Sequence, residues 1–265
     1  MTNLSPPTNA PNPLDNTLTP IAQNRDVIPV ELAELTRGDA GQGVSFDRDD
    51  ILTPLARILQ TNSPQCSPRD AAYIAGAEPG HWWLRNALHP IISGVDGISA
   101  IHCGQRHVWI EYAPQRGGFV AKHDVEPTDL VDGLNDKGRP ISIRSSTKNV
   151  VEHVREIYLL TLLDSVWLPY VFGCSKTQHQ FAKEFMTHIC QHRHPTSGAV
   201  MPSFARTYKL TTIPTKNALG SWFKPKFEDL GWTPKAEYLE AKKFHQFVQQ
   251  GTARGDYHGE YADAT

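Results

Sequence analysis

Histidine and cysteine side chains gather near residue 190, where they could ligate a metal ion. His188 and His192 are four residues apart and share one face of a predicted helix, while Cys190 and His194 lie on another flank. Both residue types ligate zinc. Because the spacing matches neither a zinc finger nor a His-Glu-x-x-His site, a polar helix end rich in histidine is the commoner explanation. We therefore expect no cofactor and keep these four residues as the candidates for a zinc site.

A second chemistry is indicated by residues 139–226, where positive charge alternates with aromatic rings. Twelve Lys or Arg side chains stand against four acids there, a local net charge of +8 in a chain whose total is −2. Cations that follow phosphates, together with rings that stack on bases, are what a groove for single-stranded nucleic acid requires. The predicted binding residues are Trp82, Trp83, Arg106, Trp109, Tyr112, Arg144, Lys148, Lys176, Tyr208, Lys209, Trp222, Phe223, Lys224 and Lys226.

Each of these candidates has a competing structural role. Trp82 and Trp83 would point to opposite faces of a strand, so one can be buried while the other is exposed. Alternation over residues 98–112 places His107 and Trp109 opposite Val108 and Ile110, and one tryptophan in the core is the alternative. The same alternation places Arg106 and Tyr112 on the face of Val108 and Ile110, unless a β-bulge intervenes.

The cationic candidates are weighed in the same way. Arg144 and Lys148 flank a hydroxyl-rich segment that suits phosphate contacts, or else forms a solvated loop. Lys176 opens the helix expected over residues 177–192, where free N–H groups attract a phosphate oxygen or receive an ordinary cap. The strongest candidates lie on the last two expected strands, which would bring together Tyr208, Lys209, Trp222, Phe223, Lys224 and Lys226.

Signatures of catalysis are weak, so we expect no catalytic residues. The sequence contains no phosphate-binding P-loop and no dinucleotide-binding glycine motif. Asp164, Lys183 and Glu184 could be imagined as a nuclease site, but their order differs from the usual Asp…Glu-x-Lys arrangement. A DNA-processing nuclease is therefore the third of three functional hypotheses.

Charge divides the chain into three parts. Residues 1–47 have a net charge of −4 and many prolines, which predicts a disordered acidic arm with a short helical piece over residues 27–35. Residues 48–250 have a net charge of +4 and should form the nucleic-acid-binding domain. Residues 251–265, with a net charge of −2, are expected to be a short acidic tail.

Composition limits where the protein works. No stretch is long and apolar enough to span a membrane, and the N-terminus lacks the features of a signal peptide. The four cysteines are far apart, which is typical of a reducing compartment. We therefore expect no membrane partner and a cytoplasmic location, in the host cytoplasm if a phage encodes the chain; an oligomer is compatible with the sequence.

The hydrophobic patterns predict a mainly β protein with helices, of the α+β class. Strands are expected over 81–85, 98–112, 119–123, 154–163, 166–174, 204–212 and 221–227, helices over 49–60, 177–192 and 236–250, and a long loop over 124–149. Three strands, a helix and two more strands follow the element order of a five-stranded Greek-key barrel of the OB type, here decorated with loops.

Three segments resemble phage single-stranded-DNA-binding proteins of the T7 type and their tailed-phage relatives, which are OB-folds. They are residues 51–60 with 76–80, residues 174–178, and residues 208–212 with 217–222. The resemblance implies coating of single strands in replication or recombination, and recruitment of replication or recombination proteins by an acidic tail. The tail here departs from that pattern, because it is short and ends Asp263-Ala264-Thr265 without a terminal aromatic residue.

The leading hypothesis is thus sequence-nonspecific binding of single-stranded DNA in phage replication or recombination. The first alternative is a zinc-stabilised interaction or virion-associated module without affinity for DNA. Metal analysis and oligonucleotide titration separate these two hypotheses.

Overall fold

The computed structural model describes residues 52–85, 90–114, 117–135, 138, 140–218 and 220–257. These residues belong to the unit formed by residues 46–265. The expected arm over residues 1–47, with its helical piece, and the tail residues 258–265 lie outside the described residues.

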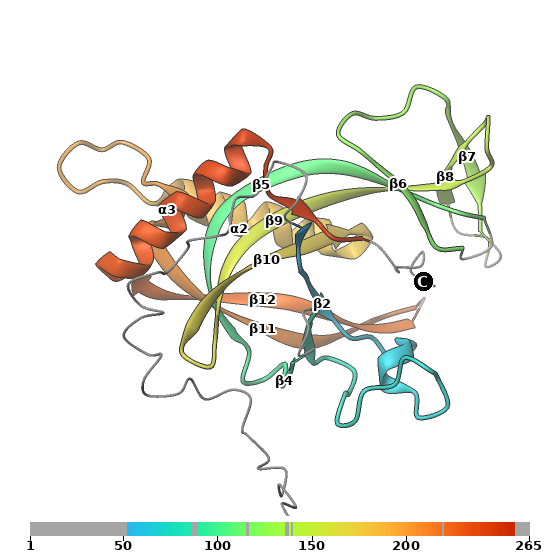
Figure 1. Ribbon diagram of the computed structural model, residues 1–265, viewed down its shortest axis with the longest axis horizontal. Coiled ribbons are helices and arrows are strands. Elements are labelled where there is room, and N and C mark those ends of the chain that lie inside the picture. The colour runs from blue at the N-terminus through green and yellow to red at the C-terminus, as the bar shows by residue number, and fades with distance from the viewer. Residues whose placement is uncertain are drawn as a thin grey trace, which may run out of the picture. The chain divides into compact units, whose positions relative to one another are not determined.

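Strands dominate the described residues, and the α+β class is confirmed (Figure 1). The strands are β1 Leu52–Thr53, β2 Leu55–Ile58, β3 Trp82–Leu84, β4 Ile91–Ile92, β5 Ile98–Tyr112, β6 Phe119–His123, β7 Leu130–Leu134, β8 Pro140–Arg144, β9 Val150–Leu163, β10 Val166–Ser175, β11 Arg206–Asn217, β12 Gly220–Trp232 and β13 Arg254–Gly255. The helices are α2 His179–Gln191 and α3 Lys235–Gln250, with short 3-10 turns at Pro64–Cys66, Lys176–Gln178 and Ser203–Ala205.

Eleven of the described strands form one curled half-barrel sheet. Eight follow the order β12-β11-β5-β9-β10-β2-β3-β4, with β6 beside β5 and the β7–β8 pair joined to β9. All of the pairings are antiparallel except that of β10 with β2. The two remaining strands, β1 and β13, pair in parallel as a separate ribbon.

The two helices cover opposite faces of the sheet. On the concave face, α2 buries Phe181 and Phe185 against one apolar cluster that includes Tyr208. On the other face, α3 buries Phe244 and Val248 against a second cluster (Figure 1). Each strand between the helices is therefore apolar on both sides, which explains the continuous hydrophobic runs of β9 and β10.

A side-chain amide links β2 to β12, the strand at one end of the curled sheet. Gln60, just after β2, donates from Nε2 to the Phe223 carbonyl at 3.0 Å and accepts from the Phe223 N–H at 2.9 Å. The side chain thus links two strands that do not pair with each other in the sheet.

Gln60→Ala should lower the free energy of unfolding by about 1–3 kcal/mol, because it leaves two half-buried backbone groups of Phe223 without their partner. Gln60→Glu keeps the acceptor but places a second oxygen against the Phe223 carbonyl, so it should be at least as costly. Chemical denaturation of the two variants measures the effect. A loss no larger than that of the exposed Gln250→Ala would show that the bridge contributes nothing.

Two expectations about elements are wrong. Residues 49–60 do not form a helix where they are described; β1 and β2 lie there, separated by Pro54. Residues 124–149 are not one long loop, because they contain β7 and β8. Gly133 indicated a loop, yet it sits in β7, where a Cβ would collide with the Ile143 side chain of β8. The described helices are neither long nor apolar enough to cross a bilayer.

Candidate nucleic-acid interface and a histidine–carboxylate cluster

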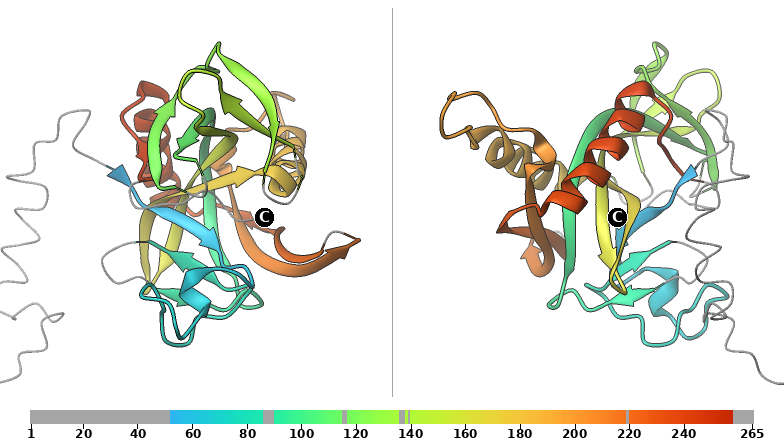
Figure 2. Two further views of the ribbon diagram at one scale, coloured as in Figure 1. Left: turned by 90° about the vertical axis from the view of Figure 1, so that its right-hand side faces the viewer. Right: turned by 60° about the vertical axis from the view of Figure 1, so that its left-hand side comes forward.

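The β11–β12 hairpin carries the strongest cationic face of the predicted site. Along β12, Phe223 and Phe227 pack on the core side, so Trp222, Lys224 and Lys226 point to the opposite face. Their cross-strand partners on β11 are uncharged: Thr215, Ile213 and Thr211. Figure 2 shows the tip of this hairpin, in orange, curving away from the other strands.

Lys209 extends this face toward the base of the hairpin, where its register partner is Glu228. Among the described residues, no ion pair engages Lys209, Lys224 or Lys226. The indole N–H of Trp222 likewise has no described hydrogen-bond partner, although the ring is half-buried. We call this group the hairpin face. It consists of Lys209, Trp222, Lys224 and Lys226, which lie on one side of the hairpin.

Other predicted rings lie inside the core. Trp82 is fully buried and meets Phe172 edge-on, with ring centroids 5.1 Å apart. Tyr112 and Tyr208 are also buried, and Phe223 packs against the concave cluster with its ring over Gly80. Their rings fill the interior and do not form a surface platform.

Trp83 and Arg106 have different surroundings. Trp83 is half-buried on the opposite face of β3 from its neighbour, in register with Arg57 of β2. The Arg106 guanidinium donates to the Val248 carbonyl at the end of α3 and lies 5.8 Å from the Tyr158 ring centroid. A cation at the C-terminus of a helix stabilises the helix dipole, so Arg106 has a structural role.

Arg144 is held by two carboxylates. Its side chain donates to Glu111 Oε2 at 3.1 Å and to Asp129 Oδ1 at 2.8 Å. Burial would raise the pKa of Glu111, but hydrogen bonds from Asn149, His123 and Arg144 outweigh burial and lower it. Lys148 is exposed in the same loop. Of the two predicted residues Arg144 and Lys148, Lys148 alone therefore has no described ion-pair partner.

Lys176 precedes α2, and its Nζ lies 2.9 Å from Glu152 Oε1. Part of its charge is thus offset, in contrast to the lysines of the hairpin face. It occupies the 3-10 turn that leads into the helix and has a positive φ of 48°.

Trp109 belongs to a cluster of rings that the sequence did not reveal. It stacks on His153, whose Nε2 lies 3.2 Å from His107 Nδ1. His179, at the start of α2, places Nε2 3.1 Å from the His153 carbonyl oxygen. Burial, followed by His179, His107 and Arg155, lowers the pKa of His153 and favours its neutral form. Alternation along β5 places His107 and Trp109 on one face, but the register of β5 with β9 brings His153 to them, and spacing within either strand does not reveal that register.

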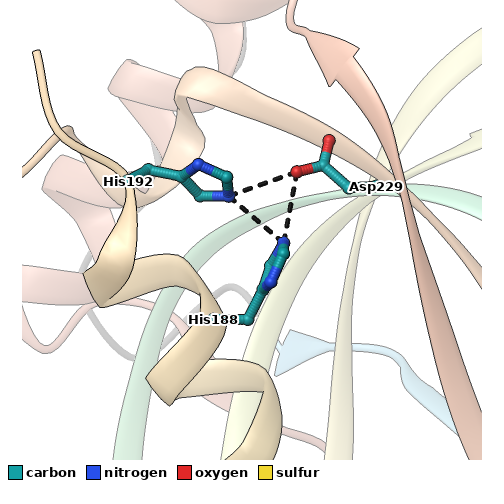
Figure 3. A group of neighbouring side chains, drawn as sticks. All are labelled: His188, His192 and Asp229. Carbon is teal, nitrogen blue, oxygen red and sulfur yellow. Dashed lines mark hydrogen bonds and ion pairs between the residues drawn. The ribbon is translucent and has the colours of Figure 1, made fainter. Parts of the chain in front are cut away.

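Two of the predicted metal ligands meet a third ligand that the sequence analysis missed (Figure 3). His188 Nε2, His192 Nε2 and Asp229 Oδ2 lie 3.2 Å from one another in each pair. His188 comes from the last turn of α2, His192 is the residue that caps the C-terminal end of this helix, and Asp229 comes from β12. By alternation, Asp229 lies on the same face of β12 as Phe223 and Phe227. An acid on the core face of a strand is the sequence feature that could have indicated this third ligand.

The surroundings of this triad fix its charge. Asp229 Oδ1 accepts from the Gly231 N–H at 2.8 Å and from Arg206 Nε at 2.9 Å. Burial would raise the pKa of Asp229, but the hydrogen bonds from Arg206, Gly231 and His188 lower it, which keeps the carboxylate ionised. Burial, and then the charge of Arg206, lowers the pKa of His192. Neutral imidazole beside ionised carboxylate is the protonation state that metal binding requires.

The other two predicted metal ligands lie outside the triad. Cys190 is exposed on α2. His194 belongs to the following loop, where its Nδ1 accepts from the Thr196 and Ser197 N–H groups at 3.3 Å. Among the nuclease candidates, Asp164 lies in the β9–β10 turn, while Glu184 bonds to Gln180 along α2. No group of three ligating side chains in the described ranges contains Asp164 or Glu184.

Comparison with known proteins identifies a phage family. The family model described as Pam3 phage gp34-like protein matches residues 24–254, which is most of the chain. No curated protein and no solved structure matches. The expected membership of a single-stranded-DNA-binding family of the T7 type is wrong, because the matching model describes a different phage family and the shared segments were short and carried no catalytic or ligand signature. The chain belongs to the Pam3 phage gp34-like protein family.

Proposed function

We propose that this phage protein binds single-stranded nucleic acid without sequence preference through the hairpin face. The observation that carries the proposal is the alternation of Trp222, Lys224 and Lys226 on one side of β12. Lysines that face solvent without an ion-pair partner can contact phosphates, and a half-buried indole can stack on a base. Such contacts follow the backbone and any base, which gives affinity without sequence selection.

The connectivity of the sheet supports the proposal. The strands β5, β9 and β10 form an antiparallel meander, α2 follows, and β11 returns to pair with β5 before β12. This is the order of an OB barrel, a fold that presents extended strands to nucleic acids. We propose that the half-barrel is an OB-like barrel in which β2 and β3 extend the sheet beyond β10, and in which the Gln60 side chain links β2 to β12 across the open side.

Charge supports a polyanion as the ligand. On the hairpin face, three lysines stand against Glu228 alone. Each phosphate contact with a single strand contributes about 0.7 to the slope of log affinity against log salt. Three contacts therefore predict a slope of about −2, a value that a titration can measure.

Anisotropy titration of a labelled oligo-dT strand, repeated at several salt concentrations, tests the proposal. The double substitution Lys224→Ala/Lys226→Ala should weaken binding roughly tenfold at moderate salt and make the slope shallower by about 1.4. Trp222→Ala should remove about 1–3 kcal/mol, the usual contribution of one stacked base.

A matched control carries the same change of charge elsewhere. Lys183→Ala/Lys242→Ala removes two exposed lysines from α2 and α3, and it should leave affinity and slope near the wild-type values. The proposal fails if wild-type protein binds no strand at low salt, or if both double variants lose the same affinity.

A further inference from the structure

The triad of His188, His192 and Asp229 is a site separate from the proposed nucleic-acid interface, because it lies on the opposite side of the hairpin from the lysines. Asp229 lies on the same, core-facing side of β12 as Phe227, and its partner His188 lies on α2. We propose that the triad binds one divalent transition-metal ion of the zinc class, which joins the last turn of α2 to β12.

The spacing of the three ligand atoms fits such an ion. Zinc lies about 2.0–2.2 Å from imidazole nitrogen or carboxylate oxygen. Ligands at that distance in tetrahedral or octahedral geometry are separated by about 3.0–3.4 Å. The observed separations are 3.2 Å for all three pairs, so an ion about 1 Å above their plane would lie within bonding distance of each atom.

The carboxylate is oriented for this role by its neighbours. Oδ1 is held by the Gly231 N–H and by Arg206, which leaves Oδ2 directed at both imidazole rings. Arg206 Nε also approaches Oδ2, at 2.6 Å, so an ion would share that oxygen with the guanidinium or displace it toward Oδ1. Hydrogen bonds of this kind to the second oxygen are typical of protein ligands to metals.

The imidazole rings are positioned by packing. The ring centroid of His188 lies 5.1 Å from that of Phe227 and 5.9 Å from that of Tyr208. Ile189, between the two histidines, is buried in the concave cluster. His188 therefore projects from an anchored helical turn, and His192 follows at the helix cap, where its N–H donates to the Ile189 carbonyl.

The ligand set selects the class of ion. Two imidazole nitrogens and one carboxylate oxygen suit Zn²⁺, Co²⁺, Ni²⁺ and Fe²⁺, whereas Ca²⁺ and Mg²⁺ prefer oxygen ligands only. The side chains of the triad are between 17% and 32% exposed, so solvent can complete the coordination. An ion held by α2 and β12 should stabilise the fold, because an unfolded chain does not present the three ligands together.

Titration of tag-free protein with Co²⁺ and Zn²⁺ tests the inference. We expect one equivalent of Co²⁺ to produce visible d–d absorption that Zn²⁺ abolishes, and Zn²⁺ to raise the melting temperature. His192→Ala and Asp229→Asn should each weaken binding at least about 100-fold and remove the rise in melting temperature.

The matched control is His194→Ala, which removes a histidine two residues beyond the triad and should leave binding unchanged. The inference is overturned if wild-type protein binds Zn²⁺ more weakly than about 0.1 mM, or if His192→Ala and Asp229→Asn bind as tightly as His194→Ala does. Because Asp229→Asn is nearly isosteric and the wild-type titration needs no variant, a misfolded His192→Ala protein does not compromise the test. Neither readout involves DNA, so failure here is distinct from failure of the proposed function.

Discussion

Lys122→Met is expected to lower the free energy of unfolding by about 3–5 kcal/mol. The Glu156 carboxylate is fully buried, and Lys122 Nζ lies 2.6 Å from its Oε1. Its other oxygen accepts from the Tyr158 hydroxyl at 2.7 Å. Without Lys122, the buried negative charge would keep, among the described residues, the neutral hydrogen bond from Tyr158, and desolvation of the charge would no longer be offset. Equilibrium denaturation at pH 7 measures the loss.

Two further variants separate the pair from a general effect of lysine removal. Lys122→Met/Glu156→Met replaces both charges by apolar groups and should recover most of the stability, because no charge remains buried. Lys243→Met breaks an exposed ion pair with Glu240 on α3 and should cost less than about 1 kcal/mol. If Lys122→Met proves as mild as Lys243→Met, the carboxylate is stabilised by something other than Lys122.

His102→Leu should make the protein less sensitive to acid. His102 is fully buried, and neither of its ring nitrogens has a hydrogen-bond partner among the described residues. Burial, with a smaller contribution from His245, lowers the pKa of His102 to about 4 from the ordinary value of 6.5. Between these two values the unfolded chain binds a proton that the folded chain does not, so wild-type stability falls as the pH is lowered from about 6.5 to 4. The fall attributable to this ring should total about 3 kcal/mol.

Denaturation curves at several pH values test this expectation. His102→Leu should be more stable than wild type at pH 5 and should show a flatter profile, because leucine takes up no proton and leaves no unpaired nitrogen. His194→Leu replaces an exposed histidine and should give a curve parallel to that of wild type. Parallel curves for wild type and His102→Leu would contradict the expectation.

Long amphipathic patterns made several elements predictable. The expected strand over 98–112 matches β5, and the expected helices over 177–192 and 236–250 match α2 and α3 within two residues. Alternation also put Val108 and Ile110 on one face of the strand, and both are buried there. Such segments extend over many residues, so one misleading side chain does not change the pattern.

Short segments and tertiary groupings could not be predicted. Residues 52–58 form strands through pairing with β13, β10 and β3, and no local signal reports partners so distant in the chain. Spacing brought His188 and His192 together, but Asp229 joins them through the packing of α2 on β12. Composition likewise could not show that Arg144 and Lys176 have carboxylate partners while Lys224 and Lys226 have none in the described residues.

The parallel ribbon of β1 and β13 has a consequence for biosynthesis. It joins Leu52 to Arg254, and the neighbouring Ala253 carbonyl oxygen lies 3.2 Å from the Tyr158 hydroxyl oxygen. During translation, most of the sheet can emerge from the ribosome before residues 253–257 exist, so the apolar surface that Tyr257 covers stays open until then. We expect nascent chains to be most prone to aggregation before residues 253–257 are synthesised, and we expect these residues to pack onto the sheet last.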